Sequence, residues 1–206
     1  MKSFEHYFDY KSPYAYLAQA GAFELAQRTG AELHLIPYTL DIPAYLGSAR
    51  VSGDGEVLKE SRNAHQWRRV KYAYMDCRRE ANRRGLTIRG PRKIFDSRLA
   101  HIAYLFAGRS GLALQRQFHM HAFEKFWRRE LDIEDIKVLT NELHLVGIDG
   151  TGFADYVERA GREALKAIQT QAEARGVFGV PSYRVGDQLY WGGERLEHVQ
   201  EHLERN

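Results

Sequence analysis

Residues 4–38 have the sequence FEHYFDYKSPYAYLAQAGAFELAQRTGAELHLIPY. The aromatic run Phe4–Tyr10 is short and typical of a β-strand. Ser12 and Pro13 predict the start of a helix, because serine is a good N-cap and proline fits the first helical turn. Gly30 predicts its end, and the alternation from Glu32 to Tyr38 predicts a second strand. This stretch therefore predicts a strand–helix–strand unit.

The other end of the chain predicts a matching piece of the same fold. Ser182–Val185 and Gln188–Trp191 flank a Gly-Asp pair, which is typical of a hairpin turn. Leu196–Leu203 then predicts a closing helix. Neither end has enough strands to bury an apolar face alone, so we expect one sheet built from both ends.

The middle of the chain is expected to be an insertion made of helices. Ser48–Gly55 is rich in Gly, Ser and Asp and is expected to form a loop. Helical patterns follow at about Leu58–Gly85, Arg98–Ala107, Leu112–Trp127, Ile133–Val146 and Gly152–Ala174. The predicted organisation is one domain formed by residues 1–42 with 165–206, and an all-helical domain at residues 43–164.

Composition narrows the class of protein. Hydrophobic residues make up 44% of the 206 residues, enough for a sizeable core, and no run approaches the roughly 20 apolar residues of a membrane span. The N-terminal segment lacks the apolar run of a secretory signal, so a cytoplasmic protein with no membrane partner is expected. Cys77 is the one cysteine, which excludes an internal disulfide and dithiol chemistry. In mid-helix, it is expected to be packed and not reactive.

Basic residues are concentrated in one stretch. Ten lysines and arginines lie between Arg68 and Lys93, opposed by Asp76 and Glu80, although the formal net charge of the chain is only +3. Most are expected on a solvated helix face, and a few to attract an anionic ligand into a cleft. A basic nucleic-acid-binding protein is the alternative function from a different class.

Two segments carry candidate chemistry near the predicted sheet. Ser12 lies where a strand meets a helix N-terminus, a place that favours negative charge. Its hydroxyl can donate a hydrogen bond to a bound thiolate, or it can serve only as a helix cap. Val180-Pro181 leads into a strand: a cis bond there would turn the Val180 backbone toward an extended peptide, whereas a trans bond would indicate an ordinary turn.

A third segment, Trp191–Leu196, precedes the last helix. Glu194 can bind an ammonium group there while exposed helix N–H groups bind a carboxylate, or it can simply cap the helix. The nearby His198–His202 stretch matches the zinc pattern H-x-x-E-H, but no later segment can supply a third ligand. We expect a surface helix face there and no metal.

Together, the three segments resemble a known family. Residues 8–18 (FDYKSPYAYLA), 176–181 (GVFGVP) and 191–196 (WGGERL) are similar to 2-hydroxychromene-2-carboxylate isomerases, relatives of the kappa-class glutathione transferases. The resemblance implies an α/β fold in which a thioredoxin-like domain, formed from both chain ends, carries the inserted helical domain. It also implies a homodimer and a role in the degradation of aromatic compounds.

The resemblance also implies a cofactor and its site. Ser12 occupies the place of the first redox cysteine of thioredoxin-like relatives, and glutathione binds with its thiol beside that serine. The glutathione contacts implied by the family are Ser12, Val180, Pro181, Trp191, Gly193, Glu194 and Arg195. In this family the thiolate adds to a conjugated double bond of an aromatic carboxylate, a bond rotates, and the thiolate leaves. The alternative within enzymes is a kappa-like glutathione transferase, which consumes glutathione.

The substrate side is expected in the inserted domain, at Lys71, Phe95 and Asp96. The family often has asparagine where this chain has Asp96. The extra negative charge disfavours a carboxylate substrate unless Lys71 or a nearby arginine offsets it.

Overall fold

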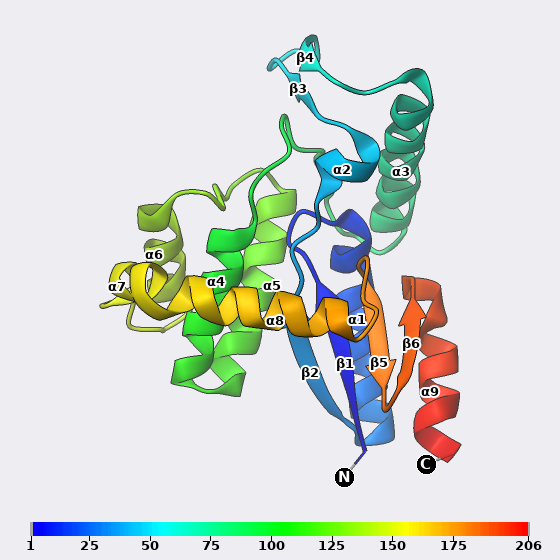
Figure 1. Cartoon of the computed structure of the whole chain (residues 1–206), viewed down its shortest axis with the longest axis vertical. Coiled ribbons are helices and arrows are strands. Elements are labelled where there is room, and N and C mark those ends of the chain that lie inside the picture. The colour runs from blue at the N-terminus through cyan, green and yellow to red at the C-terminus, as the bar shows by residue number, and fades with distance from the viewer. Residues whose placement is uncertain (1, 206) are drawn as a thin grey trace. The chain divides into compact units, whose positions relative to one another are not determined.

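The computed structural model describes residues 2–205, and the chain divides into two compact units (Figure 1). One unit combines the chain up to Leu40 with the chain from Asp155 onward, and the other is Asp41–Ala154. The predicted second boundary differs, because residues 155–164 group with the first unit. There the π-helical segment Val157–Gly161 runs directly into α8 (Arg162–Ala174). Residues 1 and 206, the ends of the predicted domain, lie outside the described residues.

The first unit contains one sheet drawn from both chain ends, as predicted. Its strands are ordered β2 (Glu32–Pro37), β1 (Ser3–Phe8), β5 (Ser182–Val185) and β6 (Gln188–Trp191). The β1–β2 pair is parallel, while β1–β5 and β5–β6 are antiparallel. This order places β1, which leads to Ser12, next to β5, which follows Pro181.

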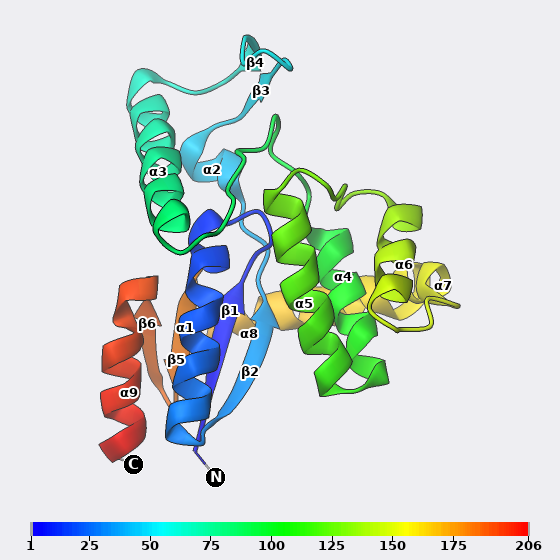
Figure 2. The same ribbon diagram turned by 180° about the vertical axis from the view of Figure 1, so that it is seen from behind.

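Helices cover both faces of this sheet. α1 (Pro13–Thr29) and α9 (Leu196–Arg205) lie on one face and α8 on the other (Figures 1 and 2). α1 begins and ends where the sequence predicts, with Ser12 as N-cap and Gly30 in the left-handed conformation that glycine adopts readily. The buried core between α1, α9 and the sheet consists of Phe4, Ala18, Ala22, Leu25, Ala31, Tyr183, Val185, Val199 and Leu203.

The second unit is mainly helical. Its longer helices are α3 (Ala64–Arg83), α4 (Arg98–Ala107), α5 (Leu112–Trp127) and α6 (Ile136–Leu145), with short α2 (Ile42–Leu46) and α7 (Phe153–Tyr156) near its ends. Cys77 is fully buried in α3, which confirms that it is packed. No helix within residues 2–205 is both long and apolar enough to cross a membrane.

One part of the second unit differs from the prediction. β3 (Ala49–Val51) and β4 (Val57–Glu60) form an antiparallel hairpin where a loop and the start of a helix were expected. Its strands carry β-branched valines, which favour strands, on either side of a Gly-Asp-Gly turn. α3 starts later, after Asn63, whose side chain forms a capping box with Gln66. The insertion is therefore not all-helical.

A histidine is buried in the sheet of the first unit. His6 on β1 has no solvent exposure, and among the described residues neither ring nitrogen has a hydrogen-bond partner. Its ring lies against that of Tyr183, with 4.9 Å between centroids. Burial lowers the pKa of His6 to about 3, because the charged imidazolium would have no solvation there.

This burial predicts sensitivity to acid. Because the folded-state pKa lies below the unfolded value of about 6.5, the unfolded chain binds a proton first as the pH falls. The stability contributed by neutral His6 is fully present above pH 6.5 and is lost between about pH 6.5 and 3, by up to about 1.4 kcal/mol per pH unit. In urea unfolding, His6→Leu should flatten this part of the pH profile. Parallel profiles for the wild type and the variant would contradict the assignment.

Candidate active site

The turn from β1 into α1 is held by the carboxylate of Asp9, which has no solvent exposure. Its Oδ1 accepts a hydrogen bond from the Lys11 backbone N–H (3.1 Å), and its Oδ2 accepts one from the Leu40 N–H (2.8 Å). The Lys11 ammonium lies 3.4 Å from Oδ2, and Lys11 is also buried. One carboxylate thus ties the end of β1, the loop before α1 and the segment after β2 together.

Ser12 caps α1 in the position that this turn fixes. The Ala15 N–H donates to Ser12 Oγ (3.2 Å), and the Ser12 N–H donates to the Asp9 carbonyl (3.0 Å). Ser12 is 4% exposed. The cap uses Oγ only as an acceptor, so the hydroxyl proton remains able to donate to a second group. Capping and donation to an anion at the helix N-terminus are therefore compatible roles.

The Val180-Pro181 peptide bond is cis. The Ser182 hydroxyl donates to the Gly179 carbonyl (2.7 Å), which holds the turn before β5. Gly179 lies so close to Trp191 that a Cβ there would be 2.9 Å from the indole Nε1, so only glycine fits without a shift. The sequence left open whether the Val180-Pro181 bond is cis or trans, and the structure has the cis form.

The segment after β6 lies against both α1 and Pro181. The Gly192 N–H donates to the Pro181 carbonyl (2.9 Å), and Gly192 has a φ of +110°, a conformation that favours glycine. A Cβ on Gly193 would lie 3.5 Å from the Ala18 Cβ and 4.0 Å from the Pro181 Cγ. The structure therefore brings the Pro181 and Trp191–Arg195 segments together beside α1, the helix that Ser12 caps.

Exposed side chains surround this junction. Trp191 is 55% exposed, and its ring lies 5.2 Å from that of Phe178, which is also exposed. Glu194 is 69% exposed, with its Oε1 3.7 Å from Arg195 Nε. Burial raises the pKa of the Tyr183 hydroxyl, and the negative charge of Glu194 raises it further. The Glu194 carboxylate thus acts electrostatically on a buried side chain of the sheet. The surface offers both signs of charge to a zwitterionic ligand.

The predicted substrate residues all lie in the second unit. Phe95 lines a cavity there, whereas Lys71 is exposed on α3 and does not line that cavity. Asp96 is offset by an arginine, since both of its carboxylate oxygens accept from Arg98 Nε at 2.9 Å. The charge that would disfavour a carboxylate substrate is thus neutralised locally, by Arg98 and not by Lys71.

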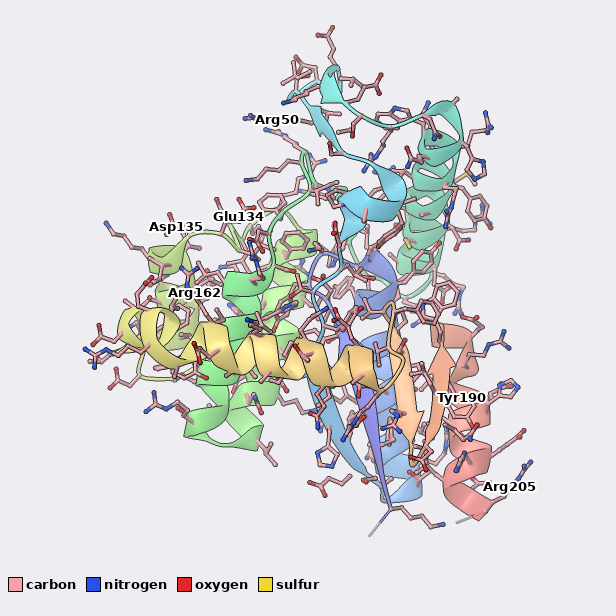
Figure 3. All side chains as sticks on the ribbon, viewed as in Figure 1. Arg50, Glu134, Asp135, Arg162, Tyr190 and Arg205 are labelled. Carbon is pink, nitrogen blue, oxygen red and sulfur yellow. The ribbon has the colours of Figure 1, made fainter. Side chains whose placement is uncertain are left out.

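Two further predicted features have defined surroundings: the segment at Asp96 and the histidine pattern in α9. The Asp96 N–H donates to Glu134 (2.7 Å), which is labelled in Figure 3 and also pairs with Lys93. The stretch His198–His202 was expected on a surface face of α9: His198 is exposed, but His202 is half-buried beside Tyr190, with 2.9 Å between its Nδ1 and the phenol oxygen. Sequence reasoning missed the Asp9–Lys11 pair. The available signal was a lysine directly before the candidate serine, two residues after an aspartate.

Comparison with known proteins agrees with this architecture. Residues 4–204 match the DsbA-like thioredoxin domain, and the chain belongs to that class. It is 30% identical over 203 residues to a 2-hydroxychromene-2-carboxylate isomerase of Sphingobium xenophagum, covering 98% of each chain. A Pseudomonas putida protein of the same name is 28% identical over 196 residues, with 93% of this chain and 89% of the relative covered. A solved 2-hydroxychromene-2-carboxylate isomerase structure is 22% identical and superposes with a TM-score of 0.74 over 98% of this chain and 94% of its own.

Within the DsbA-like class, the chain therefore belongs to the 2-hydroxychromene-2-carboxylate isomerase family. The predicted thioredoxin-like fold with an inserted, mainly helical unit is confirmed.

The Asp9–Lys11 pair generates a stability prediction. Asp9→Asn should lower the free energy of unfolding by about 3–5 kcal/mol, because it removes the negative charge that lies 3.4 Å from the buried Lys11 ammonium. Lys11→Met in the same chain removes that ammonium, so the double variant should lose less than the two single losses added together. Urea denaturation of the four proteins measures the coupling. Additive losses would show that the two charges do not interact.

Proposed function

We propose that this chain is a glutathione-dependent isomerase of an aromatic carboxylate of the 2-hydroxychromene-2-carboxylate type. One observation carries the proposal: a serine hydroxyl, and no thiol, caps the buried N-terminus of α1 beside the sheet. Cys77, the single cysteine, is buried in another unit. This arrangement suits stabilisation of a ligand's thiolate and cannot perform dithiol exchange.

The residues around Ser12 fit a peptide thiol. The N-terminus of α1 carries the positive end of the helix dipole, and the Ser12 hydroxyl can donate to the sulfur. In this proposal the Val180 backbone, before β5, pairs with the extended cysteinyl residue of glutathione, as the family resemblance implies. Glu194 and Arg195 are exposed and oppositely charged, which suits the ammonium and carboxylate of a γ-glutamyl group.

Bound glutathione would supply a thiolate for reversible addition to a conjugated double bond of the substrate. Addition would leave a single bond that can rotate, and departure of the thiolate would regenerate glutathione. The role of Ser12 in this scheme is to hold the sulfur in its ionised form. A free thiol with a pKa near 8.5 is mostly protonated at neutral pH, and a donor at a helix N-terminus shifts the equilibrium toward thiolate. Ser12 is not assigned as a nucleophile, because within residues 2–205 its hydroxyl has no hydrogen bond to a basic side chain.

The direct test is turnover of 2-hydroxychromene-2-carboxylate by the full chain, with and without glutathione. We expect isomerisation that requires glutathione and leaves its concentration unchanged. Consumption of glutathione with chlorodinitrobenzene, without isomerisation, would instead identify a kappa-like transferase. Failure of millimolar glutathione to raise the melting temperature, together with salt-dependent retention of DNA, would favour the nucleic-acid-binding alternative.

A matched pair of variants tests the γ-glutamyl contact in the same assay. Glu194→Gln should weaken glutathione binding by about tenfold, because it removes a charged partner of the ammonium group. Glu197→Gln removes another exposed acid, from the first turn of α9, and should leave binding unchanged. Equal effects of both variants would remove Glu194 from the site.

A further inference from the structure

Arginines of the second unit converge on the loop that contains Gly90. The Arg129 guanidinium donates to the Gly90 carbonyl from Nε (2.9 Å) and from Nη2. A Cβ on Gly90 would lie 3.3 Å from Arg78 Nη2, so a second guanidinium reaches the same residue. Arg89 and Arg92 flank this point in the sequence. Four arginine side chains thus come from three places in the chain: α3, the loop before α4 and the turn after α5.

These four arginines differ from their neighbours in their lack of ion pairs among the described residues. Within residues 2–205, none of Arg78, Arg89, Arg92 and Arg129 forms an ion pair with a carboxylate. Neighbouring arginines do: Arg128, for example, pairs with Glu124 at 2.6 Å. Burial, and then the charges of Arg92, Arg78 and Arg89, lower the pKa of Arg129. Within residues 2–205, the positive charge of this cluster is therefore not taken up by ion pairs, although Glu130 and Asp132 lie in the lining of the same cavity.

Two of these arginines line a cavity with aromatic walls. The cavity has a volume of about 440 Å³, within the range of small-molecule sites. Arg92 and Arg129 line it together with Phe95 and Phe126, whose rings meet edge to face at 5.4 Å. The Lys93 ammonium lies 4.7 Å from the centre of the Phe95 ring. A planar ring fits such walls, and guanidinium groups pair with a carboxylate through two parallel hydrogen bonds.

Acidic residues in the lining restrict the ligand further. Glu130 and Asp132 also line the cavity, and Asp132 Oδ1 accepts from the Glu134 N–H (2.9 Å). Their charges repel a ligand that is anionic over its whole length, such as a polyphosphate or a nucleic acid. An apolar ring with a single carboxylate avoids that repulsion, because only one end needs to meet the arginines.

We propose that this cavity binds the carboxylate of a planar aromatic acid, with Arg92 and Arg129 holding the carboxylate and Phe95 and Phe126 contacting the ring. The assignment deepens the proposed function and rests on it, since it names the residues of this chain that select an aromatic carboxylate. Neither arginine was singled out as a substrate contact from the sequence. Arg129 also stands out by its backbone, because it is the non-glycine residue with a positive φ (62°) among those described.

Calorimetric titration of the full chain with 1-naphthoate, and with the neutral 1-naphthamide, tests the proposal. We expect the carboxylate to bind at least about tenfold more tightly than the amide. Arg92→Gln and Arg129→Gly should abolish that preference. Glycine suits the backbone at residue 129, and Arg92→Gln leaves the Gly90 contact of Arg129 intact, so the two variants do not share a folding risk.

Two matched variants sharpen the result. Arg128→Ala removes a neighbouring arginine that is already paired with Glu124, and it should leave naphthoate binding unchanged. Glu130→Gln removes a carboxylate from the lining and should tighten it. Equal affinity for naphthoate and naphthamide, or an equal loss in Arg92→Gln and Arg128→Ala, would overturn the proposal. So would tripolyphosphate binding that depends on Arg92 and is tighter than naphthoate binding.

Binding of an aromatic acid to the cavity and binding of glutathione are measured independently on the same protein samples. Naphthoate is titrated without glutathione, and the effect of glutathione on the melting temperature is measured separately. Arginine-dependent naphthoate binding without a glutathione effect would support the cavity and contradict the glutathione chemistry. A glutathione effect without naphthoate binding would contradict the cavity alone.

Discussion

Asp9 places a carboxylate without solvent exposure at the point where β1 must turn into α1. A buried carboxylate is costly unless hydrogen bonds and a counter-charge surround it, and here two backbone N–H groups and the Lys11 ammonium do so. Because those partners come from the α1 entry and from the segment after β2, one carboxylate ties the end of β1 and the start of α1 to the end of β2. The orientation of Ser12 depends on this arrangement.

The chemistry available at the site follows from that geometry. A thioredoxin-like fold presents a helix N-terminus beside a sheet, and a thiol placed there undergoes redox exchange. A serine at the same position keeps the favourable field for an anion but cannot be oxidised to a disulfide. The site is therefore suited to stabilising a sulfur anion that a ligand brings. Membership of an isomerase family agrees with chemistry that needs no net oxidation.

The sequence predicted those parts of the fold whose signals are local. Ser12-Pro13 and Gly30 mark the ends of α1, and the Gly-Asp turn marks the β5–β6 hairpin, because each signal acts within a few residues. The β3–β4 hairpin was missed since its strands are short and β4 runs into a helical pattern. The basic stretch Arg68–Lys93 and Phe95 predicted an anion-attracting cleft only in general terms, and the pairing of Arg92 with Arg129 could not be predicted. It depends on segments nearly 40 residues apart that meet only after α5 packs against the loop before α4.

In the proposed function, the Ser12 hydroxyl stabilises the thiolate of bound glutathione. Ultraviolet thiolate absorbance, recorded against pH with saturating protein, gives the pKa of the bound thiol directly. We expect a thiol pKa below about 8.5 in the wild type, and a pKa higher by about one unit or more in Ser12→Ala and Ser12→Gly. Glycine costs the helix cap only a few tenths of a kcal/mol, so agreement between the two variants separates the hydroxyl from the cap. An unchanged thiol pKa in both variants, with glutathione still bound, would contradict the role assigned to Ser12.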